Sequence, residues 1–152
     1  MGTERRPGKA IVDAAHALGV QHFIYSSADL GNLPHTGVMG FEVKREIENH
    51  IKALAPPMGY TILRPAQFMD NLLPTSPFFL KVSRTILLRK TFVQHPERKH
   101  QLVSTRDIGR MGAKVITQPA VYLGREVRLA GDEVTMPELE MIYREVCSLP
   151  LL

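Results

Sequence analysis

Three groups of polar side chains in this sequence could form one site: a serine pair, a lysine and an arginine. Ser26 and Ser27 follow the apolar stretch HFIY, which has the composition of a short buried strand. Lys44 lies in a segment with helical spacing that begins near Met39, and Arg64 ends a second β-rich stretch, YTIL. In parallel α/β sheets, ligands bind outside the carboxyl ends of the strands, where the following helices begin. The pattern therefore predicts a ligand site at that edge of a sheet.

Each candidate also has a purely structural interpretation. Serines at strand ends commonly bond to loop backbone groups, and a helical lysine is usually a solvated charge. The structural alternative pairs Arg64 with a carboxylate such as Asp70. It also puts Phe68 and Met69 in the core and lets Asn71 hold a turn. The shared location of the candidates is what favours a site.

Hydrophobic periodicity predicts the elements that would position these side chains. A helical pattern ends at Gly19, a strand spans 22–26, a second helix spans about 39–54, and a second strand spans 60–63. Helix and strand alternating with short links is typical of a parallel α/β sheet, with the two strands joined by a right-handed crossover. The predicted fold class is therefore α/β.

The 39–54 helix has one apolar stripe, which we expect to face the sheet. Its members are Val43, Ile47, Ile51 and Leu54. Glu48 and Lys52 stand four residues apart among the polar positions, so we expect them to pair with each other on the exposed side.

The pattern is less regular beyond Pro74, but three features can be placed. Asp107 is predicted to cap a helix, and 126–129 alternates as a short strand. Thr135 and Glu138 have the spacing of a capping box that begins the last helix.

Composition limits the possible classes of protein. The 152 residues have a formal net charge of +4, and the densest basic stretch, 89–100, is broken by Pro96 and Glu97. We interpret that stretch as a solvated loop or edge strand, so no direct nucleic-acid binding is expected. No apolar run approaches the roughly 20 residues of a membrane span. The single cysteine, Cys147, fits a reducing compartment, so the cytoplasm is expected, with the nucleus as the alternative.

Motifs for other chemistries are missing from the sequence. The six histidines have no metal-ligand spacing and Cys147 has no partner cysteine, so no metal site is expected. The sequence also contains no G-x-S-x-G elbow, no P-loop and no G-x-G-x-x-G turn.

Five segments together carry a resemblance to a known family. The segments GKAIVDAAHALGVQHFIYSSAD, FEVKREIENHIK, YTILRPAQFMDNLL, DIGRMGAKVI and VRLAGDEVTMPELEMIYREV resemble, in order and spacing, the NmrA-like family of atypical short-chain dehydrogenases. The resemblance covers nearly the whole chain, and the block TILRPAQFMDN is its most specific part.

The resemblance implies a fold, a cofactor and a set of contacts. The fold is an NAD(P)-binding, doubly wound Rossmann-like sheet with a small α+β lobe on the substrate side. We therefore expect one domain over 1–152, with the carboxyl-terminal half of the Rossmann sheet in about 1–73 and a mixed part in about 74–152. NADP or NAD is the implied cofactor, with Ser26 and Ser27 beside the nicotinamide and Lys44 bonded to its ribose.

The same resemblance implies that a loop closes over the nicotinamide end of the cofactor. Its residues in this chain are Phe68, Met69, Asp70 and Asn71. The family includes redox-sensing regulators that contact partner proteins, and NADPH-dependent reductases.

Two departures from the family pattern shape the expected function. The first strands and their glycine-rich turn, which bind the pyrophosphate, are expected before residue 1. The chain would then hold only the nicotinamide side of the site and an open sheet edge that invites self-association. In addition, Gly40 stands four residues before Lys44, where ordinary short-chain dehydrogenases have a catalytic tyrosine.

Three functions remain open from the sequence. The first is an NAD(P)-binding, redox-sensing regulator with a protein partner, for which no catalytic residue is assigned. The second is an NAD(P)H-dependent oxidoreductase of a small quinone or carbonyl compound, and the third is an inactive fragment.

Overall fold

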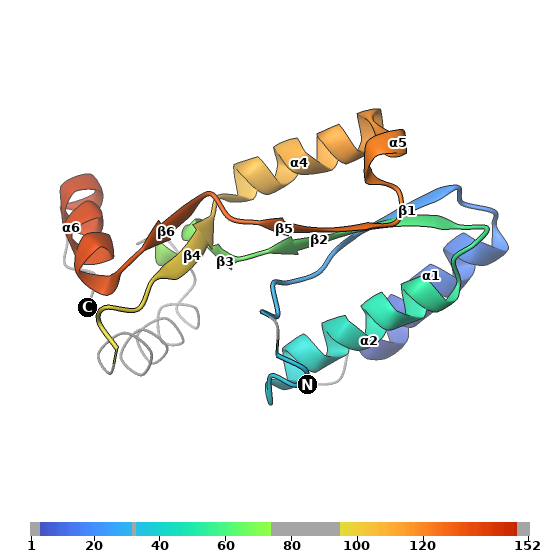
Figure 1. Cartoon of the computed structure of the whole chain (residues 1–152), viewed down its shortest axis with the longest axis horizontal. Helices are drawn as coiled ribbons and strands as arrows, with labels where there is room; N and C mark the ends of the chain where they lie inside the picture. Colours follow the sequence, from blue (N-terminus) through green and yellow to red (C-terminus); the bar gives the residue numbers. More distant parts are fainter. Residues whose placement is uncertain (1–3, 32, 74–94, 149–152) are drawn as a thin grey trace. The chain divides into compact units, whose positions relative to one another are not determined.

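The computed structural model describes residues 4–31, 33–73 and 95–148 of the chain, so the first half of the basic stretch 89–100 lies outside the described residues. Two compact units divide the chain. Unit 1 comprises Met1–Pro65 with Ile108–Leu129, and unit 2 comprises Ala66–Asp107 with Ala130–Leu152. The chain therefore leaves unit 1 after the second strand of its sheet and returns to it for one more strand (Figure 1).

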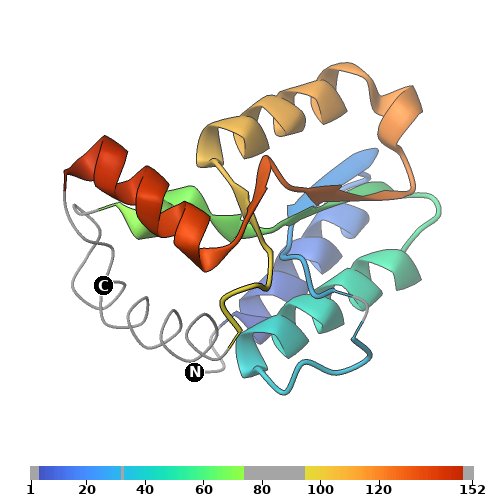
Figure 2. The same cartoon turned by 60° about the vertical axis from the view of Figure 1, so that its left-hand side comes forward.

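Unit 1 contains a parallel sheet with helices on both faces. Its elements are α1 (Arg5–Ala17), β1 (His22–Ser26), α2 (Met39–Ala53), β2 (Gly59–Pro65), most of α4 (Thr105–Thr117), α5 (Pro119–Tyr122) and β5 (Arg125–Leu129). The strand order is β1-β2-β5, with Tyr25 opposite Ile62 and Leu63 opposite Val127. Helices α1 and α2 cover one face and α4 the other (Figure 2). The predicted parallel α/β sheet is confirmed.

The first helix ends as the sequence predicts. Gly19 has φ +69°, and the N–H of Val20 donates to the carbonyl of Ala15 while the N–H of Gly19 donates to His16. This pair of bonds is a Schellman motif, which needs a residue that adopts a left-handed conformation without strain. The chain can therefore turn at once from α1 into β1.

The core of unit 1 lies between α1, α2 and the sheet. The stripe predicted on α2 is confirmed, because Val43, Ile47 and Ile51 are buried with Val12 of α1 and Met58. A Cβ added at Gly8 of α1 would come within 2.5 Å of Ile47. The two helices therefore approach closely where α1 has no side chain.

The edges of this sheet differ in charge. Within the described residues, β1 and β5 each pair only with β2, so both are edge strands. The sequence of β1 is HFIYS, and burial lowers the pKa of His22, which favours the neutral form of its ring. The sequence of β5 is REVRL, in which three of five side chains are charged.

Unit 2 contains a second sheet, a short 3₁₀ helix and the last helix. Its elements are β3 (Gln67–Phe68), η1 (Met69–Leu72), β4 (His100–Val103), β6 (Asp132–Val134) and α6 (Met136–Cys147). Strand β4 pairs in parallel with β3 and antiparallel with β6. The predicted capping box is present: the N–H of Thr135 donates to Glu138 at 2.7 Å.

The predicted cap at Asp107 is wrong by one turn. Helix α4 begins at Thr105, and Ser104 precedes it. The N–H of Asp107 donates to Ser104 Oγ at 3.1 Å, and the Ser104 hydroxyl donates to the Asp107 carboxylate at 2.8 Å. Asp107 is thus the acidic partner of the cap in the first turn, where it also faces the positive end of the helix dipole.

Candidate functional site

The two predicted serines stand at the carboxyl end of β1. Ser26 is its last residue and is exposed, whereas Ser27 is only 4% exposed. The N–H of Ser27 donates to Leu63 at 2.8 Å, which continues the pairing with β2. Its Oγ is buried and has no hydrogen-bond partner among the described residues. Buried hydroxyls are nearly always paired, so this one is available to a ligand or a water molecule.

The loop after Ser27 is fixed to the rest of the sheet. The N–H of Asp29 donates to Pro65 at 2.8 Å, and the Asp29 carboxylate accepts the N–H of Gly31 at 2.9 Å. Arg128 of β5 adds two bonds to the same carboxylate, at 2.9 and 3.0 Å. These bonds fix the backbone of the loop that would border a site at this edge.

Lys44 lies in the second turn of α2 and faces β1. Its ammonium is 5.6 Å from the centre of the Tyr25 ring and donates to Glu4 at 3.3 Å. Its side chain is 25% exposed, so the ammonium is shielded in part but still reachable by a ligand.

Tyr25 of β1 is the strand residue that Lys44 faces, but it is not suited to donate a proton. Its hydroxyl is buried without a hydrogen-bond partner among the described residues. Burial, followed by the charges of Glu4 and Glu48, raises its pKa to about 12. A phenol that acts as an acid near neutral pH needs a lowered pKa. Gly40 stands at the position where ordinary short-chain dehydrogenases have their catalytic tyrosine, and Tyr25 therefore does not take over that role.

A partly buried network of ion pairs joins α2 to the sheet of unit 1. Glu48, 1% exposed, accepts two bonds from Arg64, at 3.1 and 2.6 Å. Arg64 also lies 2.7 Å from Glu126, which pairs with Lys52. The predicted Glu48–Lys52 pair is therefore wrong, and the structural alternative that pairs Arg64 with a carboxylate is met by Glu48 and Glu126 rather than by Asp70. Helix α2 is instead tied to β2 and β5, and the hydrogen bonds that Arg64 donates to Glu48 raise the pKa of Arg64.

The other four predicted residues belong to unit 2. Phe68 ends β3, and Met69, Asp70 and Asn71 form η1. Asp70 accepts the N–H of Thr105 at 3.0 Å and its hydroxyl at 2.8 Å. These bonds, the backbone one first, lower the pKa of Asp70. Asp70 thus holds the start of α4. The cofactor contacts expected for these four residues, and for Ser26, Ser27 and Lys44, stay predictions.

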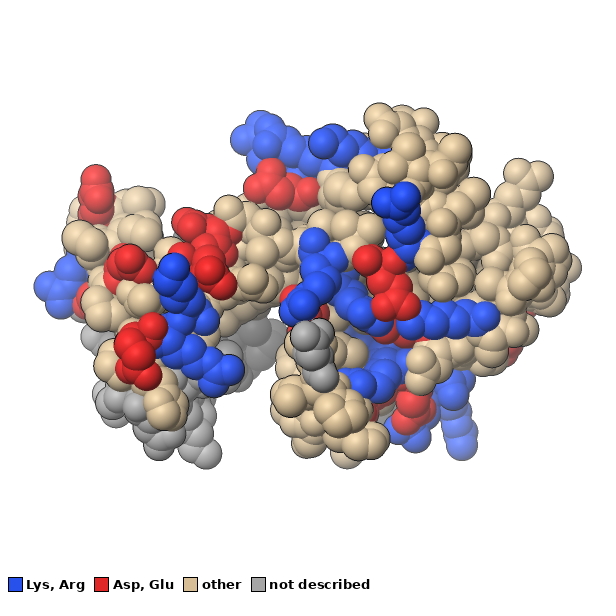
Figure 3. Space-filling model, in the orientation of Figure 1, with Lys and Arg blue, Asp and Glu red and all other residues tan. Residues whose placement is uncertain are grey.

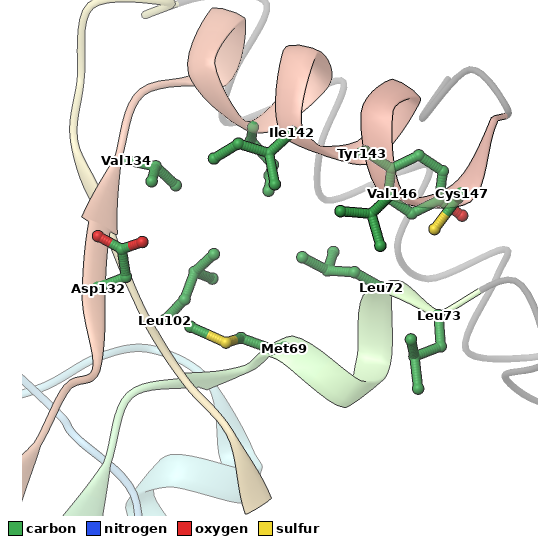
Figure 4. Close-up of a pocket in the computed structure, with 11 residues that line it drawn as sticks. Met69, Leu72, Leu73, Leu102, Asp132, Val134, Ile142, Tyr143, Val146 and Cys147 are labelled. Atoms are coloured by element: carbon green, nitrogen blue, oxygen red, sulfur yellow. The ribbon is translucent and has the colours of Figure 1, made fainter. Parts of the chain in front are cut away.

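Unit 2 also encloses an apolar cavity of about 300 Å³ (Figure 4). Met69, Leu72 and Leu102 line one side, and Ile142 and Val146 of α6 line the other. The described lining contains one charged side chain, that of Asp132, so the cavity offers packing rather than acid–base chemistry.

The described residues lack the features of two other kinds of protein. They contain no group of three or more His, Cys, Asp or Glu side chains that could hold a metal ion. None of the described helices is long and apolar enough to cross a membrane.

Comparison with known proteins assigns the fold. A nucleoside-diphosphate-sugar epimerase from Staphylococcus aureus has a TM-score of 0.70 at 22% identity, over 97% of this chain and 50% of that one. NmrA, a negative transcriptional regulator solved in complex with NADP, has a TM-score of 0.70 at 18% identity, over 98% and 48%. A short-chain dehydrogenase/reductase superfamily protein from Agrobacterium tumefaciens, with bound NAD, has a TM-score of 0.68 at 17% identity, over 97% and 59%. The chain thus spans about half the length of these structures.

Comparison of sequences adds the family. No curated protein matches the chain. The model of the NmrA-like family matches residues 1–151. The chain therefore belongs to the NmrA-like family.

Proposed function

We propose that this chain supplies the nicotinamide side of an NAD(P) site in a redox-sensing regulator. The observation that carries the proposal is the buried, unpartnered Oγ of Ser27 at the carboxyl end of β1. Family membership supports it, as do the NADP and NAD complexes of the similar structures. When bound, the oxidised or reduced form of the dinucleotide would report the redox state by which of the two forms occupies the site.

Ser27 and Lys44 fit such a group by their chemistry. A hydroxyl donates to or accepts from a carboxamide, and an ammonium donates to ribose hydroxyls. Lys44 already has a single acceptor, Glu4, which a ribose could displace or share because both side chains are partly exposed. The family resemblance is what implies Phe68, Met69, Asp70 and Asn71, and their part in cofactor binding stays a prediction.

Regulation is favoured over reduction of a substrate by the acid–base groups near Lys44. Gly40 has no side chain that could act as an acid, and the pKa of Tyr25 is raised to about 12. A regulator needs only to bind the dinucleotide and present a surface to a protein partner, so it needs no proton donor.

Fragments of the cofactor test the half-site. In ¹⁵N NMR titrations of the chain, nicotinamide mononucleotide should shift the amide signals of Ser27 and Lys44. The expected dissociation constant is about 1 mM, which corresponds to a binding free energy of about −4 kcal/mol. Adenosine 2′,5′-bisphosphate should leave them unchanged. Lys44→Met should weaken binding of the mononucleotide. Lys114→Gln, at an exposed position, should leave its binding unchanged. Equal binding of both fragments, or of neither, would contradict the proposal.

A second assay separates regulator from oxidoreductase. NADPH with a quinone acceptor should be consumed no faster with the protein than in buffer. Turnover that Lys44→Ala abolishes would overturn the regulatory assignment and leave the cofactor site in place.

A further inference from the structure

A polar cavity of about 280 Å³ lies in unit 1, between α2, the loop after β1 and the end of β2. Three cationic side chains, Arg45, Lys52 and Arg64, and one carboxylate, Glu48, line it together with Asn49. In Figure 3, Lys and Arg side chains gather with a few acidic ones over α2 and β5. We propose that this cavity binds a small oxyanion, a carboxylate or phosphate group, through Arg45 and Asn49.

The guanidinium of Arg45 is held in place on one side only. Its Nη2 donates to the carbonyl of Leu33 at 2.8 Å, and its buried Nε lies 3.6 Å from Glu42. No described residue accepts a bond from Nη1. Glu42 in turn accepts two bonds from Thr36, both at 2.7 Å, which hold its carboxylate in place. Arg45 is therefore preorganised and keeps donors for a ligand.

Asn49 supplies the second contact. It follows Arg45 by four residues on α2, so both side chains share one face of the helix. Its amide makes no hydrogen bond to any described residue. An amide and a guanidinium side by side present several N–H donors, which suits the planar or tetrahedral oxygens of an oxyanion.

The other two cationic side chains of the cavity are paired with carboxylates. Arg64 is neutralised chiefly by Glu48, and Lys52 by Glu126, which also contacts Arg64. Arg45 is paired in the same way with Glu42, but its Nη1 keeps donors that no described residue accepts, so an oxyanion gains hydrogen bonds there.

The size of the cavity limits the ligand. About 280 Å³ lies at the lower end of ordinary ligand sites, so acetate, succinate or phosphate fits better than a nucleotide. Gly31, which also lines the cavity, lies four residues after Ser27. This inference requires no bound dinucleotide. Its test is therefore independent of the test of the proposed function.

Titration with simple anions tests the site. In ¹⁵N NMR spectra, sodium phosphate or sodium succinate should shift the amides of Gly31, Arg45 and Asn49 saturably at millimolar concentration. Sodium chloride of equal ionic strength should not, since it reproduces only the screening. Saturation by phosphate alone or by succinate alone would identify the oxyanion class.

Variants make the test specific to the cavity. Arg45→Gln should raise the dissociation constant at least about ten-fold, as expected for a lost charge-assisted bond. Asn49→Ala, at an exposed helix position that tolerates alanine, should raise it about three-fold. The control, Lys114→Gln, should leave it unchanged. Shifts that do not saturate, or that Lys114→Gln weakens as much as Arg45→Gln, would overturn the inference. If Arg45→Gln disturbs the fold, Asn49→Ala decides alone.

Discussion

Replacing Glu48 by glutamine tests the ion-pair network that joins α2 to the sheet of unit 1. The carboxylate of Glu48 is 2% exposed and receives two bonds from Arg64. Removing one partner of a buried ion pair costs about 3–5 kcal/mol. Arg64 is 22% exposed and keeps Glu126 at 2.7 Å, so part of the cost is avoided. We expect a loss of about 2 kcal/mol in the free energy of unfolding.

Urea denaturation followed by circular dichroism measures this loss. With a slope of about 1–3 kcal/mol/M, the midpoint should fall by roughly 1 M at an unchanged slope. The matched control is Glu46→Gln on the same helix, whose carboxylate is 38% exposed and lies 2.7 Å from Arg5. An exposed pair of this kind is worth about 0.5 kcal/mol.

A double replacement supplies the decisive comparison. Glu48→Leu with Arg64→Met removes both charges, so it should be more stable than the sum of the two single replacements predicts, by about 2 kcal/mol. Additive losses, or a Glu48→Gln midpoint equal to that of Glu46→Gln, would refute the argument that this pair fixes α2 on the sheet.

Three further predictions concern packing, ionisation and capping. A Cβ at Gly59 would meet the carbonyl of Gln21 at 2.9 Å, so Gly59→Ala should lower stability by about 1–3 kcal/mol in urea, whereas Gly40→Ala, with open space around it, should not. Tyr25 should ionise near pH 12 in a tyrosinate absorbance titration against Tyr25→Phe. Because the folded state keeps this proton longer, its contribution to stability is complete below pH 10 and lost as pH rises toward 12; ionisation near 10 would contradict this. Thr135→Ala should cost about 1 kcal/mol and lower the melting temperature, and no change would mean that the capping box does not stabilise α6.

The elements of unit 1 could be predicted because their signals are local. Gly19, the α2 stripe and the β-rich stretch before Arg64 each follow from the period of a few neighbouring residues. The cap of α4 had a readable signal too, since Ser104 and Asp107 have capping-box spacing.

The partners of the charged groups could not be predicted in the same way. Glu48 has a lysine four residues later, a typical surface pattern, yet its partner Arg64 belongs to the next strand. Asp29 and Arg128 meet only because β1 and β5 lie in the same sheet. The availability of Ser27 likewise depends on burial from several elements, which no local pattern encodes.

The two outer strands of the first sheet differ in how readily each could be extended. Within the described residues, one side of β1 has no backbone partner, and His22 is the only titratable side chain besides Tyr25 in its sequence HFIYS. At β5, Arg125, Glu126 and Arg128 make the approach of another strand costly. A further strand would therefore add to this sheet at β1 rather than at β5.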